Sequence, residues 1–110
     1  MHAVPDPPGE SAPALTIDED VLPLLPKYIV FMKQYCEEAR AACRESNHDA
    51  VARLGHQIKG SGGSYGFPPI SRMGGELEAA AKAGDSARVE SWIAAILAYV
   101  NTTVAAHVPK

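Results

Sequence analysis

A histidine, a lysine and glycines recur at helical spacing in the middle of the chain. Counted from His56, Lys59 is three residues on, Gly60 four and Gly63 seven. Residues at these steps share one face of an α-helix, so the four form a single stripe. A neutral imidazole nitrogen is nucleophilic near neutral pH, and an ammonium group one turn away suits the oxygens of a phosphoryl group. The stripe therefore favours phosphoryl transfer at His56, with Lys59 as an electrostatic helper.

The apolar residues of the same segment indicate that this stripe faces solvent. Val51, Leu54 and Ile58 repeat at steps of three and four and build an inward seam. At about 100° per residue, His56 points about 140° away from Val51 and about 200° away from Leu54 and Ile58. We therefore expect the imidazole to be exposed and the seam residues to fill the core.

Several glycines crowd around the histidine, although glycine is unfavourable inside a helix. Each costs about 1 kcal/mol relative to alanine, yet Gly60, Gly62 and Gly63 share one turn and Gly55 precedes the histidine. We interpret the bare backbone as clearance that lets a partner press a phosphorylated site onto the imidazole. For Gly62 and Gly63, a frayed helix end before Gly66 is the alternative interpretation.

The run from Gly55 to Gly66 resembles the signature of the histidine-containing phosphotransfer domain. That pattern has a histidine, an apolar residue, Lys-Gly, a small residue and a later glycine, and the matching positions are His56, Ile58, Lys59, Gly60, Ser61 and Gly66. The downstream segments 77–80 and 84–85 resemble the next helix of the family and its end. The similarity thus extends from about residue 17 to the C-terminus.

This resemblance implies a shuttle of a two-component phosphorelay without a kinase activity, an ATP site or a cofactor of its own. His56 would accept a phosphoryl group from the aspartate of a receiver domain, or from a hybrid sensor kinase, and pass it to the receiver domain of another response regulator. The residues expected to dock the partner are Gly55, Gln57, Gly60 and Gly63, and Gly66 is expected to be structural. A second hypothesis stays open, in which the same face docks a signalling partner and His56 is never phosphorylated.

The elements that must position the stripe are all helical in pattern. Apolar residues recur at steps of three and four from 25 to 43, from 47 to 62 or beyond, from 69 to 83 and from 86 to 104. Short connections favour antiparallel neighbours, so we expect an all-α fold, an antiparallel up-down four-helix bundle. A capping-box spacing between Thr16 and Glu19 predicts a short extra N-terminal helix that ends near Leu24.

The composition narrows the domain organisation and the possible partners. The chain has 110 residues, of which 46% are hydrophobic, which suits one domain. We expect a flexible proline-rich leader over residues 1–15, the bundle over 16–106 and a flexible tail over 107–110. A net charge of -3 without a basic run disfavours nucleic acid. Without a long apolar stretch or signal-peptide features, we expect no membrane partner and a cytoplasmic location. One bundle can bury its own apolar seams, so we expect a monomer.

A metal site and a disulfide are both unexpected. His48 and His56 are eight residues apart on one helix, about 12 Å of rise, which is too far for one ion. His107 falls in the expected flexible tail. Cys36 and Cys43 are separated by about 10.5 Å of helical rise, beyond the roughly 7 Å over which Cα atoms can be bridged. We interpret them as two buried thiols.

Overall fold

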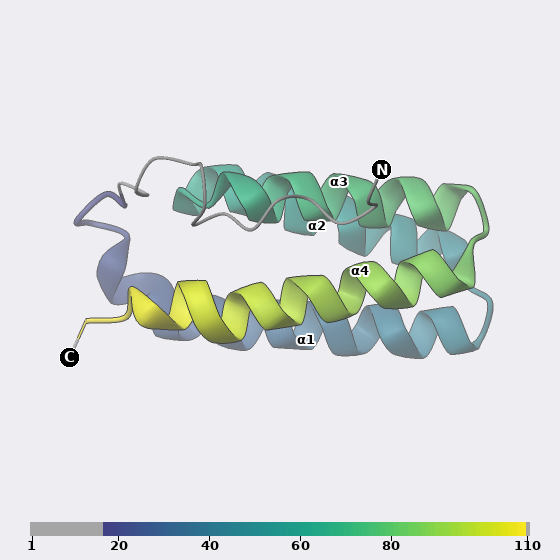
Figure 1. The fold of residues 1–110 in the computed structure, drawn as a ribbon, viewed down its shortest axis with the longest axis horizontal. Coiled ribbons are helices and arrows are strands. Elements are labelled where there is room, and N and C mark those ends of the chain that lie inside the picture. Colours follow the sequence, from purple (N-terminus) through teal and green to yellow (C-terminus); the bar gives the residue numbers. More distant parts are fainter. Residues whose placement is uncertain (1–16, 110) are drawn as a thin grey trace.

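The four predicted helices form an antiparallel up-down bundle in the computed structural model, which describes residues 17–109 (Figure 1). In chain order they are α1 (Leu25–Arg44), α2 (His48–Tyr65), α3 (Pro68–Lys82) and α4 (Ser86–Tyr99). A 3-10 turn, η1 (Leu22–Leu24), leads into α1, and a π-helical segment, η2 (Val100–Val104), extends α4. No strand occurs within residues 17–109. The all-α bundle with a short extra helix before it is confirmed, whereas the leader over 1–15 and Thr16 lie outside the described residues.

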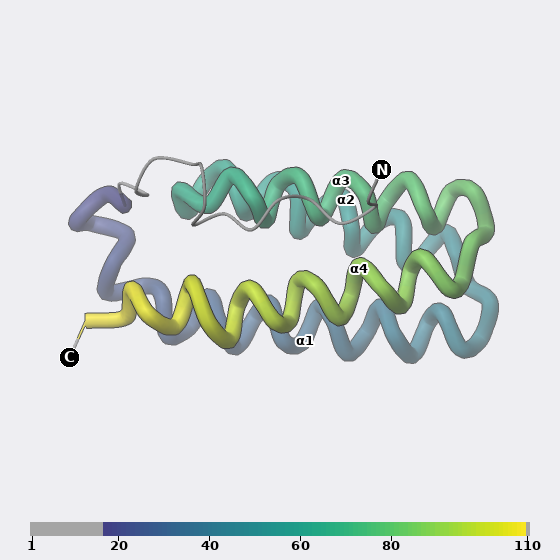
Figure 2. Tube along the Cα trace, in the orientation of Figure 1, coloured from purple at the N-terminus to yellow at the C-terminus, as the bar shows by residue number. Residues whose placement is uncertain are grey.

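Short polar and glycine-containing connections turn the chain back between successive helices from α1 to α4 (Figure 2). Asn47 caps α2 and Asp85 caps α4, each with a side-chain oxygen that accepts the backbone N–H three residues on. Gly66 ends α2 with φ 86°, and Gly84 follows α3 with φ 67°. Only glycine adopts such left-handed angles without strain, so both positions stop a helix.

The predicted seams are mostly the core. Fully buried side chains come from all four helices and include Leu25, Met32, Val51, Ile58, Ile70, Leu77, Val89, Ile93, Ile96, Val100 and Val104. One aromatic cluster was not predicted. Tyr28 is buried, its ring stacks on Tyr65 with centroids 3.9 Å apart, and its hydroxyl lies 3.0 Å from Oγ of Ser61. This cluster ties the first turns of α1 to the end of α2.

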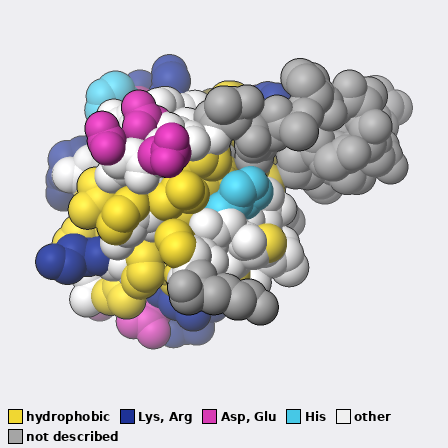
Figure 3. All heavy atoms as spheres, turned by 90° about the vertical axis from the view of Figure 1, so that its left-hand side faces the viewer, with side chains coloured by type: hydrophobic (Ala, Val, Ile, Leu, Met, Phe, Trp, Pro, Cys, Tyr) yellow, Lys and Arg dark blue, Asp and Glu magenta, His cyan; other side chains and the backbone are white. Residues whose placement is uncertain are grey.

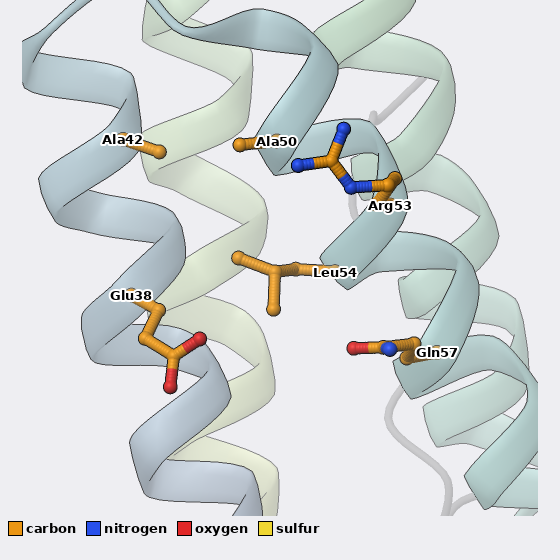
Figure 4. Close-up of a pocket in the computed structure, with 6 residues that line it drawn as sticks. All are labelled: Glu38, Ala42, Ala50, Arg53, Leu54 and Gln57. Carbon is orange, nitrogen blue, oxygen red and sulfur yellow. The ribbon is translucent and has the colours of Figure 1, made fainter.

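Leu54 departs from its predicted place in the core. It is only partly buried and lines an open hollow between α1 and α2, together with Glu38, Ala42, Ala50, Arg53 and Gln57 (Figure 4). A helical wheel gives the direction of a side chain relative to its own helix but not the width of the gap to the next one. Ile58 points into a filled space at 0% exposure, whereas Leu54 points into an open one.

Truncation of Ile58 and of Leu54 to alanine is therefore expected to lower the free energy of unfolding by different amounts. Ile58→Ala should lower the free energy of unfolding by about 2–5 kcal/mol, since it leaves a cavity in the core. Leu54→Ala should cost clearly less, because its methyl groups already contact water. Urea unfolding followed by circular dichroism measures both values. Equal losses would mean that Leu54 is as enclosed as Ile58.

Apolar side chains also reach the surface at the end of the bundle where η1 leads into α1 (Figure 3). The large exposed ones in the described part are Leu24, Val30 and Phe31. Near the same end lies His107, the first residue of the expected flexible tail. Its ring packs edge-on against Phe67, and its Nδ1 lies 2.8 Å from the carbonyl oxygen of Thr103. Ordered packing therefore extends past residue 106, the expected end of the bundle.

No helix within residues 17–109 combines the length and the apolar character that crossing a bilayer requires.

Candidate functional site

The stripe predicted on the helix from residue 47 to 62 or beyond lies on the surface of α2. His56, Lys59, Gly60 and Gly63 are all exposed, and 72% of the His56 side chain is accessible to solvent. A Cβ built at Gly60 would meet no atom within 4 Å. The imidazole and the bare turn after it are thus open to a large partner.

The flank of α2 next to this stripe is pressed against α3, and glycines make this possible. A Cβ at Gly62 would clash with the backbone nitrogen of Ser71, and a Cβ at Gly74 would lie 2.5 Å from the backbone nitrogen of Lys59. Ser71 adds a hydrogen bond across the contact, because its hydroxyl donates to the carbonyl oxygen of Lys59 at 2.6 Å. The two backbones therefore touch along the helix that carries His56.

Gly55 belongs to this contact and not to the docking stripe in which it was predicted. It is buried, and a Cβ there would lie 2.8 Å from the backbone nitrogen of Glu78. The prediction of a docking role for Gly55 is wrong, because a partner cannot reach a residue covered by α3. Its bare Cα instead lets α3 approach the residue next to His56.

This approach brings Glu78 of α3 to the imidazole, which the sequence did not predict. Oε1 of Glu78 lies 3.5 Å from Nδ1 of His56, and Oε2 lies 3.1 Å from Nζ of Lys82. The separation from the imidazole exceeds the usual hydrogen-bond length of about 2.9 Å, as is common in proteins without their partners. One carboxylate thus lies between the imidazole and an ammonium group.

The charges around Glu78 keep it ionised. A hydrogen bond from Lys82 is the main influence that lowers the pKa of the Glu78 carboxyl, and His56 lowers it further, while partial burial opposes both. Only 18% of the Glu78 side chain is exposed, against 72% of His56. The carboxylate therefore lies beneath the imidazole as a fixed negative charge.

The remaining predicted residues surround this pair. Gln57 is exposed and shares an open hollow with His56, Glu78 and Lys82. The methylene groups of Lys59 run past Gly75 of α3, since a Cβ at Gly75 would lie 3.7 Å from Cδ of Lys59. Lys59 thus lies on the same side of α2 as Glu78, one turn after His56.

The arrangement suits a nucleophilic nitrogen that is offered to another protein. A carboxylate next to Nδ1 favours the tautomer with its proton on that nitrogen, which leaves the lone pair on Nε2. The hollow beside the ring is open, so it does not enclose a small substrate as a typical enzyme pocket does. No group of three or more potential metal ligands occurs within residues 17–109. The site can therefore accept and release a group at Nε2.

Glu78 could have been suspected from one signal in the sequence. Gly55 and Gly62 are seven residues apart, so they share a face of their helix, and Gly74 opens the middle of the next helix. Such small residues permit close approach of two helices, which would have placed the α3 residues one turn after Gly74 beside His56. Gly55 was assigned instead to the docking surface, and Gly62 was interpreted as clearance around His56 or as a frayed helix end.

One of three comparisons with known proteins identifies a family. Neither the curated proteins nor the solved structures include a match to the chain. The family model described as Hpt domain matches residues 23–106, a span that contains all four helices and η2. Hpt domains take part in histidine phosphotransfer within two-component phosphorelays, where they interact with receiver domains and kinases. Because that match covers most of its length, the chain belongs to the Hpt family, the histidine-containing phosphotransfer domains.

Proposed function

We propose that this protein is a phosphorelay intermediate that carries a phosphoryl group on Nε2 of His56. The donor is the phosphorylated aspartate of a receiver domain or a hybrid sensor kinase, and the acceptor is the receiver domain of another response regulator. The observation that carries the proposal is the exposed imidazole whose Nδ1 lies 3.5 Å from the Glu78 carboxylate. That contact leaves Nε2 as the nitrogen that a partner can approach.

The transfer requires no chemistry beyond what the two proteins hold. The lone pair of Nε2 attacks the phosphorus of the aspartyl phosphate, a new N–P bond forms, and the P–O bond to the aspartate breaks with its electron pair on the carboxylate. The proton on Nδ1 stays in place, and Glu78 stabilises the positive charge that the ring acquires. Attack by the aspartate of the next receiver reverses these steps and restores neutral His56.

Lys59 and the bare turn at Gly60 serve the same transfer in this proposal. Lys59 lies one turn from His56 and supplies a positive charge to the phosphoryl oxygens as they move in line. Gly60 has no neighbour within 4 Å of its Cβ position, so the surface of a receiver can approach the ring closely. Gln57 and Gly63 are exposed beside them and complete the docking surface.

We extend the proposal to the state and location of the carrier. The chain buries its own helical seams, so it acts as a monomer. Both cysteines are free and buried, which fits the reducing conditions of the cytoplasm. The domain that carries out the transfer is the bundle over residues 16–106.

A phosphotransfer assay tests the proposed function. The protein is mixed with receiver domains that have been phosphorylated by their kinases, and the transfer of radioactive phosphate is followed by gel electrophoresis. We expect a label that is lost in acid and retained in base, because a phosphoramidate has that stability. Binding to receivers without any label, from every donor that phosphorylates its own partner, would show a non-phosphorylated adaptor instead.

Substitution of Gly60 separates docking from stability. Gly60→Ala should raise the free energy of unfolding by about 0.5–1 kcal/mol, since alanine is favoured over glycine within a helix and the added methyl meets nothing. It should slow phosphotransfer, because the methyl group protrudes into the space that the receiver occupies. Thermal melts and initial rates of labelling measure the two effects. An unchanged rate would exclude clearance as the role of this glycine.

A further inference from the structure

The cation at the end of α3 lies in a position that the transfer chemistry above does not use. Lys82 is the last residue of α3, and its Nζ lies 3.1 Å from Oε2 of Glu78, one helical turn earlier. The other oxygen of the same carboxylate faces Nδ1 of His56. The two oxygens of Glu78 therefore have different partners, one from α3 and one from α2.

We propose that Lys82 is a positioning residue of the phosphoacceptor site, which acts on His56 through Glu78. By holding Oε2, it fixes the rotation of the carboxylate so that Oε1 is directed at Nδ1, and the proton of the ring stays on Nδ1. The proposal rests on the relay function proposed above. Lys82 lies outside the stripe, and in this proposal it helps Glu78 to determine which ring nitrogen of His56 is the nucleophile.

The burial of the three side chains supports this arrangement. Glu78 is 18% exposed, whereas 67% of Lys82 and 72% of His56 are accessible. A carboxylate on a flexible stem loses its direction unless both oxygens are bound, and the backbone contact at Gly55 fixes only the start of its side chain. Lys82 supplies the second fixed point. An ordinary surface pair on one helix would not extend to a third group on another helix.

Two other cations lie near the ring, but neither forms an ion pair with Glu78 in the described part of the chain. Arg53 lines the same hollow as His56 and Lys82, one turn before the histidine. Lys59 lies one turn after it, with its stem along Gly75. Among the described residues, the ion pairs of Glu78 are with Lys82 and His56. Arg53 and Lys59 are thus placed to meet a partner, and Lys82 is placed to hold the carboxylate.

The test uses the whole chain and needs no phosphodonor in its first part. Lys82→Met keeps most of the stem and removes the charge, and Lys82→Arg restores the charge. Lys33→Met is the matched control, because Lys33 is exposed on α1. Nitrogen-15 NMR of the His56 ring reports which nitrogen carries the proton, and carbon-13 NMR of the Glu78 carboxyl reports its titration. In Lys82→Met we expect the proton to shift from Nδ1 towards Nε2 and the Glu78 midpoint to move to higher pH.

The second part measures labelling of the same variants from a phosphorylated receiver. Lys82→Met should accept phosphate roughly tenfold more slowly, the size of effect that follows loss of an orienting partner. Lys82→Arg should recover both the ring signal and the rate, and Lys33→Met should match the unmodified protein in both. Melting temperatures of all three variants should stay close to that of the unmodified protein.

Three results would overturn the proposal. A ring signal that is unchanged in Lys82→Met would show that the lysine does not set the protonation of His56. A slower rate with an unchanged ring signal would mean that Lys82 contacts the partner directly. A changed ring signal with an unchanged rate would mean that its position does not affect transfer. If the unmodified protein accepts no label, the relay function fails, and the NMR measurement still decides separately whether Lys82 orients the ring.

Discussion

His56→Gln is expected to reduce phosphate incorporation from any competent donor to background. Glutamine keeps a polar side chain of similar reach but has no nucleophilic nitrogen, because its amide lone pair is delocalised. With 72% of the His56 side chain exposed, the exchange should change the free energy of unfolding by less than about 0.5 kcal/mol. Labelling by a phosphorylated receiver and denaturant unfolding measure the two quantities on one preparation.

His48 provides the matched control on the same helix. Its Nε2 lies 3.2 Å from Oγ of Ser86, so it connects the starts of α2 and α4 and is remote from Glu78. His48→Gln should therefore keep full labelling. Label that persists in His56→Gln and disappears in His48→Gln would mean that His48, and not His56, carries the phosphoryl group. A large fall in the stability of His56→Gln would contradict the exposed position of its ring.

Gly62→Ala and Gly74→Ala are expected to be the most destabilising small changes outside the apolar core. The new methyl group would meet the backbone of the facing helix, at Ser71 in one case and at Lys59 in the other, and backbone cannot move aside as a side chain can. We expect each variant to lose about 1–3 kcal/mol or more of unfolding free energy, the usual effect of overpacking. Differential scanning calorimetry would show the loss as a lower melting temperature.

Gly60→Ala is the internal control for this effect, because it adds the same methyl group to the same helix where nothing opposes it. Opposite signs for Gly60→Ala and Gly62→Ala would establish that the glycines of α2 have two separate functions. The interface variants should also transfer phosphate poorly when folded, since a wider gap moves Glu78 away from His56. Stabilisation by Gly62→Ala would show that α2 and α3 do not touch as described.

The direction of each side chain relative to its own helix could be predicted from the sequence, and the relation between helices could not. The exposure of His56 and the burial of Ile58 both follow from the helical period and were predicted. Gly55 was assigned to the wrong surface, because a glycine pressed against another backbone and a glycine open to solvent have the same pattern in sequence. The same limit explains Leu54, whose exposure depends on the gap between α1 and α2.

The position of Glu78 next to His56 was not predicted, for a related reason. It is 22 residues beyond His56, on another helix, and only the register of α3 against α2 brings the two together. That register depends on contacts at Gly55, Gly62 and Gly74, where atoms of two backbones meet. Periodicity within one helix carries no information about it. His56 could therefore be proposed as the phosphoacceptor from the sequence, whereas the carboxylate next to its ring is evident only in the three-dimensional structure.

The one-sided exposure of His56 has a kinetic consequence for signalling. Because Glu78 of α3 lies at the Nδ1 side of the ring, the donor and the acceptor of the proposed relay would both reach Nε2 from the same direction and could not be bound at once. The carrier therefore has to leave the first protein before it meets the second, as in a ping-pong cycle. The rate of phosphoryl transfer through such a relay falls when either partner protein is in large excess. The surplus protein occupies the shared docking surface and delays the exchange of one partner for the other.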